Sequence, residues 1–323
     1  MTRFEKIPRV HTDMREKMME KKPLIIITGP TAVGKTELSI LLAKKIGGEI
    51  ISADSMQVYK NMPIATACPT EEEKNQVPHY LVEFLDNDES FSVAKWCELA
   101  KEKINDILSR GKVPIIVGGT GLFIDSLIDN ISFAEVEVDE KLRQELMNRD
   151  VCDLYDELVK VDRQASENIH KNNKKRVVRA LELYYLGSGK TQQNEASRKE
   201  KSPYDFLYFV LEYKNRQILY DRINDRVDKM LEAGLLDEAK AMYGKYQATS
   251  AQAIGHKELS KYLSGEAELE TCIEKLKQES RHYAKRQITW FKRRQDAVHI
   301  TFDDDRNAAV KTVIDKCEDF LNG

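Results

Sequence analysis

From Leu24 onward, short apolar runs alternate with longer amphipathic stretches. Continuous apolar runs of strand length predict strands at residues 24–28, 49–52 and 113–117. Apolar positions at three- and four-residue spacing predict helices at residues 36–46 and 92–110. Strands that alternate with helices in this way are typical of a parallel α/β sheet.

After Ile131 the pattern changes to charged amphipathic helices, and one further strand is predicted at residues 206–211. Apolar residues at helical spacing then predict a helix through Leu219, Ile223, Val227 and Met230, and a second long helix over residues 269–292. We therefore expect an all-helical domain of residues 131–203 inserted into an α/β core of residues 23–130 and 204–323, with residues 1–22 as an N-terminal extension.

The composition argues against a membrane protein and against a secreted protein held by disulfides. The 323 residues are 41% hydrophobic and 33% charged, and the longest apolar runs have strand length, so no membrane segment is predicted. Residues 1–22 have no apolar core of the kind a secretory signal needs. The five cysteines are scattered without a C-x-x-C pair, which indicates neither disulfides nor zinc and favours a reducing, cytoplasmic location. A monomer is the default expectation.

A phosphate-binding loop follows the first strand and opens the first helix, the context that the motif G-x-x-x-x-G-K-T requires. Its residues are Gly29, Pro30, Thr31, Ala32, Val33, Gly34, Lys35 and Thr36. Backbone amides and the helix N-terminus attract phosphate oxygens, Lys35 neutralises them, and Thr36 can ligate Mg²⁺. The loop predicts a P-loop NTPase-like core. Most such loops bind nucleoside triphosphates, so ATP binding is an expectation too.

The loop alone does not define the reaction. P-loop kinases usually place an acid for magnesium after a second apolar strand, yet the run at residues 113–117 continues into Gly118 and Gly119. An acid appears instead at Asp54, just after the strand at residues 49–52. By itself, an Asp after a strand is more often a turn or cap residue than a general base.

Five blocks of sequence resemble the tRNA dimethylallyltransferases. These are the phosphate loop, Asp54-Ser-Met-Gln57, Val117-Gly-Gly-Thr-Gly121, Arg176-Val-Val-Arg-Ala-Leu-Glu182 and Lys285-Arg-Gln-Ile-Thr-Trp290. Their order and spacing are highly specific together. The resemblance implies transfer of a dimethylallyl group from dimethylallyl diphosphate to the exocyclic N6 amine of the adenosine at tRNA position 37, beside the anticodon, with release of diphosphate. The chain ends without the Cys/His zinc module of some eukaryotic relatives, as in the short bacterial form.

The resemblance also implies roles for single residues. Asp54 is the general base for the adenine amine, while Lys35, Arg226 and Mg²⁺ stabilise the departing diphosphate. Without the resemblance, Arg222 and Arg226 would be interpreted as a solvated helix face paired with neighbouring aspartates. Residues implied to contact tRNA are Asp54, Ser55, Met56, Gln57, Thr120, Arg143, Lys175, Arg176, Arg179, Lys285 and Arg286.

Two predicted helices carry basic faces that suit an RNA backbone. In the helix at 175–185, Arg176 and Arg179 fall opposite an apolar side made of Val177, Val178, Leu181, Tyr184 and Tyr185. In the last long helix, Arg281, Lys285 and Lys292 form one stripe, Arg286 and Arg293 form another, and Ala284, Ile288 and Phe291 form an apolar sector. From charge alone, a solvated face is the favoured interpretation of the first helix and an equally good interpretation of the second. The target adenosine is expected to flip out of its stack to reach Asp54.

Four residues depart from the family pattern. Lys175 stands where glutamine often precedes Arg176. Ala65 and Cys68 stand where a glycine and a lysine are common, and His256 stands where tyrosine is frequent. A lone histidine of this kind is interpreted as structural. Two rival functions stay open at this stage, a P-loop kinase for a small metabolite and a non-catalytic RNA-binding protein that keeps the loop as a structural element.

Overall fold

The computed structural model describes residues 21–131, 139–187, 202–245, 249–303 and 305–323. Its contacts separate two compact units. Unit 1 contains the residues up to Ile124 and from Pro203 onward, and unit 2 contains Asp125–Ser202. Each unit has its own hydrophobic core.

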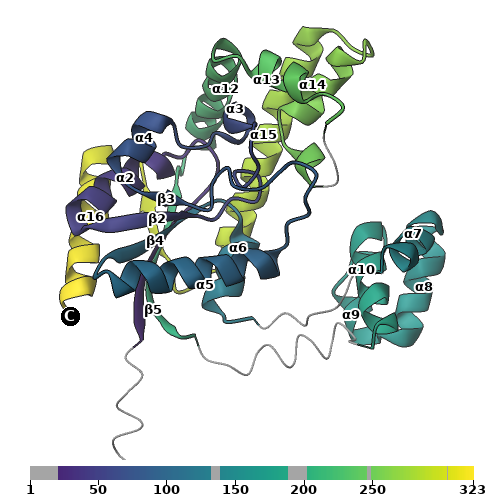
Figure 1. Cartoon of the computed structure of the whole chain (residues 1–323), viewed down its shortest axis with the longest axis horizontal. Coiled ribbons are helices and arrows are strands. Elements are labelled where there is room, and N and C mark those ends of the chain that lie inside the picture. The colour runs from purple at the N-terminus through teal and green to yellow at the C-terminus, as the bar shows by residue number, and fades with distance from the viewer. Residues whose placement is uncertain (1–20, 132–138, 188–201, 246–248, 304) are drawn as a thin grey trace, which may run out of the picture. The chain divides into compact units, whose positions relative to one another are not determined.

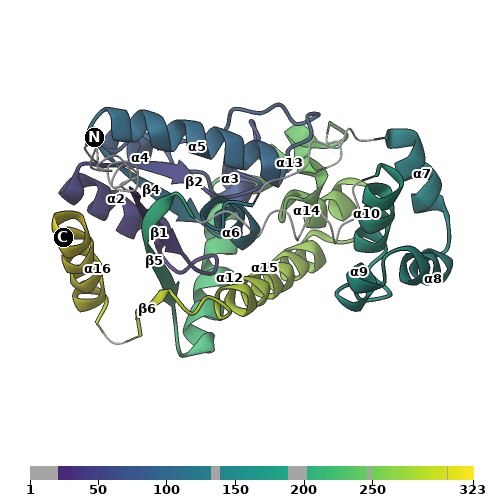
Figure 2. The same cartoon turned by 90° about the horizontal axis from the view of Figure 1, so that it is seen from below.

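Unit 1 is built on a six-stranded parallel sheet with the strand order β3-β2-β4-β1-β5-β6 (Figures 1 and 2). Its strands are β1 (Lys22–Thr28), β2 (Gly48–Ser52), β3 (His79–Tyr80), β4 (Val113–Gly118), β5 (Tyr204–Glu212) and β6 (Val298–Thr301). The central strand β1 pairs with β4 and β5, so that Ile26 lies opposite Ile116 and Tyr208. The predicted parallel α/β fold is confirmed.

Helices cover both faces of this sheet. The helices that begin in unit 1 are α2 (Lys35–Ile46), α3 (Pro63–Thr66), α4 (Glu71–Gln76), α5 (Val93–Ser109), α6 (Gly121–Ile128), α12 (Arg216–Glu232), α13 (Leu235–Met242), α14 (His256–Leu263), α15 (Leu269–Phe291) and α16 (Arg306–Asn322). One core cluster joins Leu38 and Leu42 of α2 and Val313 of α16 to alternate strand residues such as Ile25 and Ile115. Helix α5 lies on the opposite side of the sheet from α16 (Figure 2).

Two strands were missed in the sequence. The two-residue β3 and the four-residue β6 lie at the two edges of the sheet, and each pairs with a single neighbour. Runs this short carry too few positions for a periodic pattern, so neither strand was predicted. Within the described segments, no helix combines the length and apolarity needed to cross a bilayer.

In the part of unit 2 that the structure describes, the helices that begin there are α7 (Glu140–Asn148), α8 (Val151–Val161), α9 (Arg163–Glu167) and α10 (Lys174–Tyr185). Helix α10 packs on α7 and α8, and Val177, Val178 and Leu181 lie in the core as predicted. Tyr184 and Tyr185 lie in the last turn of α10 and are 41% and 48% exposed, so the core of unit 2 does not extend to them.

Candidate active site

The phosphate loop connects β1 to α2 and depends on two glycines. A Cβ on Gly29 would lie 2.4 Å from the carbonyl oxygen of Leu211 on β5, so glycine lets the loop pass this strand. Gly34 has a φ of 106° and is the N-cap of α2. Since Gly34 has no side chain to cap α2, the first amides of the helix are available to an anion.

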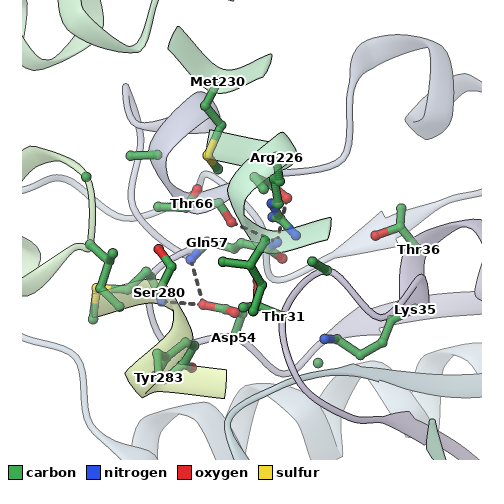
Figure 3. A pocket seen from close by; sticks show the side chains of 18 of the residues that line it. Thr31, Lys35, Thr36, Asp54, Gln57, Thr66, Arg226, Met230, Ser280 and Tyr283 are labelled. Atoms are coloured by element: carbon green, nitrogen blue, oxygen red, sulfur yellow. Dashed lines mark hydrogen bonds between the residues drawn. The ribbon is translucent and has the colours of Figure 1, made fainter. Parts of the chain in front are cut away.

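The loop borders a cavity of about 720 Å³ that is lined by residues of unit 1 (Figure 3). From the loop come Thr31, Ala32, Gly34, Lys35 and Thr36. Asp54 and Arg226 line the same cavity, as do Ser55, Met56, Gln57 and Arg286. The structure thus brings together residues from the phosphate loop, the end of β2, helix α12 and helix α15.

Lys35 is held in a poorly solvated position. Its Nζ donates hydrogen bonds to the carbonyl oxygens of Gly29 at 3.0 Å and Pro30 at 2.8 Å. Burial lowers the pKa of Lys35 to about 7, the positive charge of Arg226 acts in the same direction, and the carboxylate of Asp54 opposes both effects. A bound anion beside Lys35 would favour the charged ammonium.

Asp54 follows the carboxyl end of β2, where residues of parallel sheets commonly meet their ligands. Its Oδ1 accepts hydrogen bonds from the backbone amides of Met56 at 2.9 Å and Gln57 at 3.4 Å. Asp54 is therefore both a turn residue and a carboxylate that faces the cavity (Figure 3). The two roles are compatible because one oxygen serves the turn.

Two arginines of α12 approach the loop. Arg226 lines the cavity, where burial lowers the pKa of its guanidinium and the charge of Asp54 partly restores it. The Nε of Arg222 donates to the carbonyl oxygen of Ala32 at 2.9 Å. The alternative interpretation of these residues as a solvated face is therefore wrong, and Arg222 is a contact of the phosphate loop that sequence reasoning missed.

The residues after Asp54 are fixed by a network of hydrogen bonds. The amide of Ser55 donates to Oγ1 of Thr120 at 3.1 Å. The side chain of Gln57 accepts from Oγ of Ser52 at 2.8 Å and donates to the carbonyl oxygens of Thr66 and Ala67 at 3.3 and 2.9 Å. Met56 lines the cavity beside them.

Helix α15 reaches the site through Tyr283, Arg286 and Gln287. The guanidinium of Arg286 lies over the ring of Tyr283, 5.5 Å from its centre. Gln287 is buried, accepts from the amide of Thr31 at 2.8 Å and donates to the carbonyl oxygen of Gly119 at 3.1 Å. Tyr283 and Gln287 were missed. The sequence did contain a signal for Gln287: it is a polar residue three positions after the apolar Ala284, and so it falls on the buried side of the helix.

The predicted basic stripes of α15 are largely confirmed. Lys285, Arg286, Lys292 and Arg293 are exposed. Ala284 and Phe291 are buried and Ile288 is half-buried, as predicted. Arg281 is half-buried instead, and its Nη1 donates to Oδ1 of Asn224 at 2.6 Å.

Four predicted tRNA contacts belong to unit 2. Lys175 and Arg176 are exposed on α10. Arg143 donates two hydrogen bonds to the buried carboxylate of Glu182 at 2.6 and 3.1 Å, and Arg179 donates a third at 3.2 Å. Arg143 and Arg179 therefore hold a buried charge within unit 2, a role that sequence reasoning missed.

The chemistry of the cavity fits a magnesium ion completed by substrate. Among the residues that the structure describes, no cluster of three or more His, Cys, Asp or Glu side chains can hold a metal by itself. Mg²⁺ usually keeps several waters and takes one or two protein oxygens together with substrate phosphates. Thr36, which lines the cavity, supplies one such oxygen.

Three of the four departures from the family pattern, at Ala65, Cys68 and His256, lie in or next to the cavity, whereas Lys175 belongs to unit 2. Ala65 lines the cavity, while Cys68 is buried behind it and burial raises the pKa of the Cys68 thiol to about 12. His256 is buried, and its Nε2 lies 2.7 Å from Oε1 of Glu238. The interpretation of His256 as structural is confirmed.

The sequence of this chain is similar to those of known proteins. The sequence profile described as IPP transferase matches residues 57–294. The chain belongs to the IPP transferase family. It is 49% identical over 291 residues to a tRNA dimethylallyltransferase of Lachnoclostridium phytofermentans, covering 88% of this chain and 93% of the relative.

Solved structures of IPP transferases are similar to this chain along most of its length. A full-length tRNA isopentenylpyrophosphate transferase from Bacillus halodurans is 43% identical with a TM-score of 0.71, over 94% of this chain and 97% of that one. A eukaryotic dimethylallyltransferase, whose structure was determined acting on tRNA, is 34% identical with a TM-score of 0.81, over 93% of this chain and 80% of that one.

Proposed function

We propose that this protein is a tRNA dimethylallyltransferase, which transfers a dimethylallyl group from dimethylallyl diphosphate to the N6 amine of the adenosine at tRNA position 37. The observation that carries the proposal is that Asp54 and the phosphate loop with Lys35 face one cavity. Membership of the family supports the same reaction. An allylic diphosphate bound at the phosphate loop and a nucleobase bound beside Asp54 would therefore lie in the same cavity.

Two tasks fall to the residues of the cavity. An adenine amine is a weak nucleophile, so a base must take its proton as the new N–C bond forms. Asp54 is placed to accept that proton. As the C–O bond of the donor breaks, its electron pair leaves with the diphosphate, which the loop amides, Lys35 and Arg226 stabilise. Mg²⁺ held by Thr36 would supply further positive charge to the diphosphate.

The nucleic acid would be positioned by exposed basic residues. Lys285 and Arg286 on α15 and Lys175 and Arg176 on α10 are the candidates for phosphate contacts. The adenosine would flip out of the anticodon loop to bring its amine to Asp54. We place the protein in the cytoplasm, where its tRNA substrate is found, and propose that it acts as a monomer.

The proposal is tested by incubating the protein with Mg²⁺, unmodified tRNA and labelled dimethylallyl diphosphate, followed by mass analysis of nucleosides. Asp54→Asn keeps an oxygen that can accept the two turn hydrogen bonds but removes the base. We expect prenylated adenosine from the unaltered protein and a loss of about 10²- to 10⁴-fold in kcat for the variant.

Asp86→Asn serves as the matched control, because Asp86 is an exposed aspartate paired with Lys60. Its kcat should equal that of the unaltered protein. Absence of prenylated product, together with phosphate transfer from ATP to a small metabolite, would replace the proposal with the kinase alternative.

A further inference from the structure

Glu238 of α13 is a buried carboxylate that binds three groups at once. Its side chain is 8% exposed. Oε2 accepts from the amide of Ile64 at 2.8 Å, and Oε1 accepts from the amide of Ala65 at 3.0 Å and lies 2.7 Å from Nε2 of His256. A buried carboxylate is stable when its oxygens are satisfied in this way.

The short helix α3 depends on Glu238 for its N-terminus. The N-cap residue Met62 has no side-chain oxygen to accept a hydrogen bond, and Pro63 has no amide hydrogen to donate. The amides of Ile64 and Ala65 are the next two donors, and both bind Glu238. Glu238, which is distant in sequence, thus caps the N-terminus of α3 in place of a local N-cap side chain.

Helix α3 connects Glu238 to the cavity. Its end provides the carbonyl oxygens of Thr66 and Ala67, which accept hydrogen bonds from the side-chain amide of Gln57. Gln57 in turn accepts from Ser52, and its backbone amide donates to Oδ1 of Asp54 at 3.4 Å. A continuous chain of hydrogen bonds therefore runs from Glu238 through α3 and Gln57 to the proposed base.

Helix α14 fixes the other side of Glu238. His256, its first residue, is 2% exposed and contacts Oε1 of the carboxylate. A Cβ built on the preceding Gly255, which has a φ of 111°, would lie 3.4 Å from Cβ of Ala65. The close approach of this turn to α3 leaves little room for α3 to shift without moving the carboxylate.

We propose that Glu238 is a positioning residue for prenyl transfer: by holding α3 it fixes Gln57 and, through the turn at residues 54–57, the direction of the Asp54 carboxylate. The inference rests on the proposed function. It predicts an effect on the chemical step, because Glu238 acts on the orientation of the base and touches neither the phosphate loop nor the exposed basic residues.

Glu238→Gln tests this role. A glutamine has a single acceptor oxygen and cannot serve two amides and His256 as the carboxylate does. We expect kcat to fall about 10- to 100-fold, since a displacement of about 1 Å can cost about 100-fold in rate. KM for dimethylallyl diphosphate should change less than about twofold, because uniform binding is unaffected. Asp237→Asn, at the exposed neighbour on α13, should leave both constants unchanged.

A double-mutant cycle with Gln57→Ala separates positioning from general destabilisation. If Glu238 acts through Gln57, then Glu238→Gln should cost little further kcat in the Gln57→Ala background. Hydrogen exchange of residues 56–67 gives a second readout, independent of activity, and should be faster in Glu238→Gln than in Asp237→Asn.

Four results would overturn the inference. An unchanged kcat in Glu238→Gln, or full additivity with Gln57→Ala, would show that α3 does not transmit an effect to Asp54. A lower melting temperature with normal kcat per folded molecule would assign Glu238 to stability alone. Absence of product from the unaltered protein would instead overturn the proposed function, and this inference with it.

Discussion

Lys35 is proposed to bind a highly charged diphosphate, and this role requires a protonated ammonium group. Its side chain is buried, however, and burial disfavours the charged form of a lysine. Burial and Arg226 bring its pKa to about 7. Above that pH the unliganded side chain is mostly neutral, and a diphosphate beside it restores the charge. Binding at the loop is therefore linked to the uptake of a proton.

This linkage is measurable with inorganic diphosphate and Mg²⁺. At pH 8, calorimetry in buffers of different ionisation enthalpy should reveal proton uptake by the unaltered protein in excess of that by Lys35→Met, which has no amine. The excess should shrink at pH 6, where Lys35 is already charged. Equal uptake by both proteins at pH 8 would contradict the assignment.

Arg226 offers an independent check on the same electrostatics. Its charge lowers the pKa of Lys35, so Arg226→Gln should raise that pKa and reduce the proton uptake at pH 8. The variant should also bind diphosphate more weakly, since a charged hydrogen-bond partner contributes about 1.5 to 3 kcal/mol. Arg216→Gln, a change at an exposed residue of the same helix, should alter neither quantity.

At the scale of elements, the loop is held in place by helices that lie far from it in sequence. Gln287 of α15 binds the amide of Thr31 on one side and the carbonyl oxygen of Gly119 after β4 on the other. With Gln287 in this position, only glycine fits at position 119, because a Cβ there would lie 2.1 Å from Nε2 of Gln287. The end of β4, the loop and α15 thus form one hydrogen-bonded unit.

Gln287→Leu should break this unit. The variant leaves two backbone groups without their partner, and each such loss costs about 1 to 3 kcal/mol when the group is buried. We expect a lower melting temperature and diphosphate binding weakened by about tenfold or more. Thr289→Ala, at an exposed position on the same helix, is the control; a loss of similar size there would argue against a specific role for Gln287.

The same elements show what the sequence could reveal. The central strands were predictable because buried parallel strands are nearly continuous apolar runs, and the phosphate loop was predictable because its geometry demands glycine, lysine and threonine at fixed spacing. Gln287, Tyr283 and Glu238 were not, because their roles arise from contacts with residues more than a hundred positions away. Residues within one motif are found in a sequence more readily than contacts between helices.

At the scale of the whole molecule, the cavity and part of the proposed tRNA surface belong to different units. Among the described residues, those that line the cavity all lie in unit 1, whereas Lys175 and Arg176 lie in unit 2. Unit 2 has its own core and its own buried charge, Glu182, held by Arg143 and Arg179. Binding of diphosphate and binding of tRNA should therefore respond separately to mutation.

Reversing both charges, in Lys175→Glu with Arg176→Glu, tests this separation. If these residues bind phosphates of the tRNA backbone, tRNA binding should weaken and its dependence on salt should fall by about one unit of slope for each phosphate that is no longer neutralised. Diphosphate binding should stay unchanged. Lys141→Glu with Lys160→Glu, at exposed lysines of α7 and α8, makes the same change in net charge and is the control. Equal salt slopes for the double variant and the unaltered protein would remove these residues from the tRNA surface.

The strand order has a consequence for how the protein is made. Strand β1 leaves the ribosome early, but its neighbour β5 begins at Tyr204, and Gln287 follows Thr31 by 256 residues. A nascent chain therefore carries the complete phosphate motif long before the surroundings that shape it exist. Until β5 has emerged, the unpaired apolar edge of β1 is a candidate for chaperone binding, and until α15 has emerged the growing chain has no formed site with which to sequester prenyl donor.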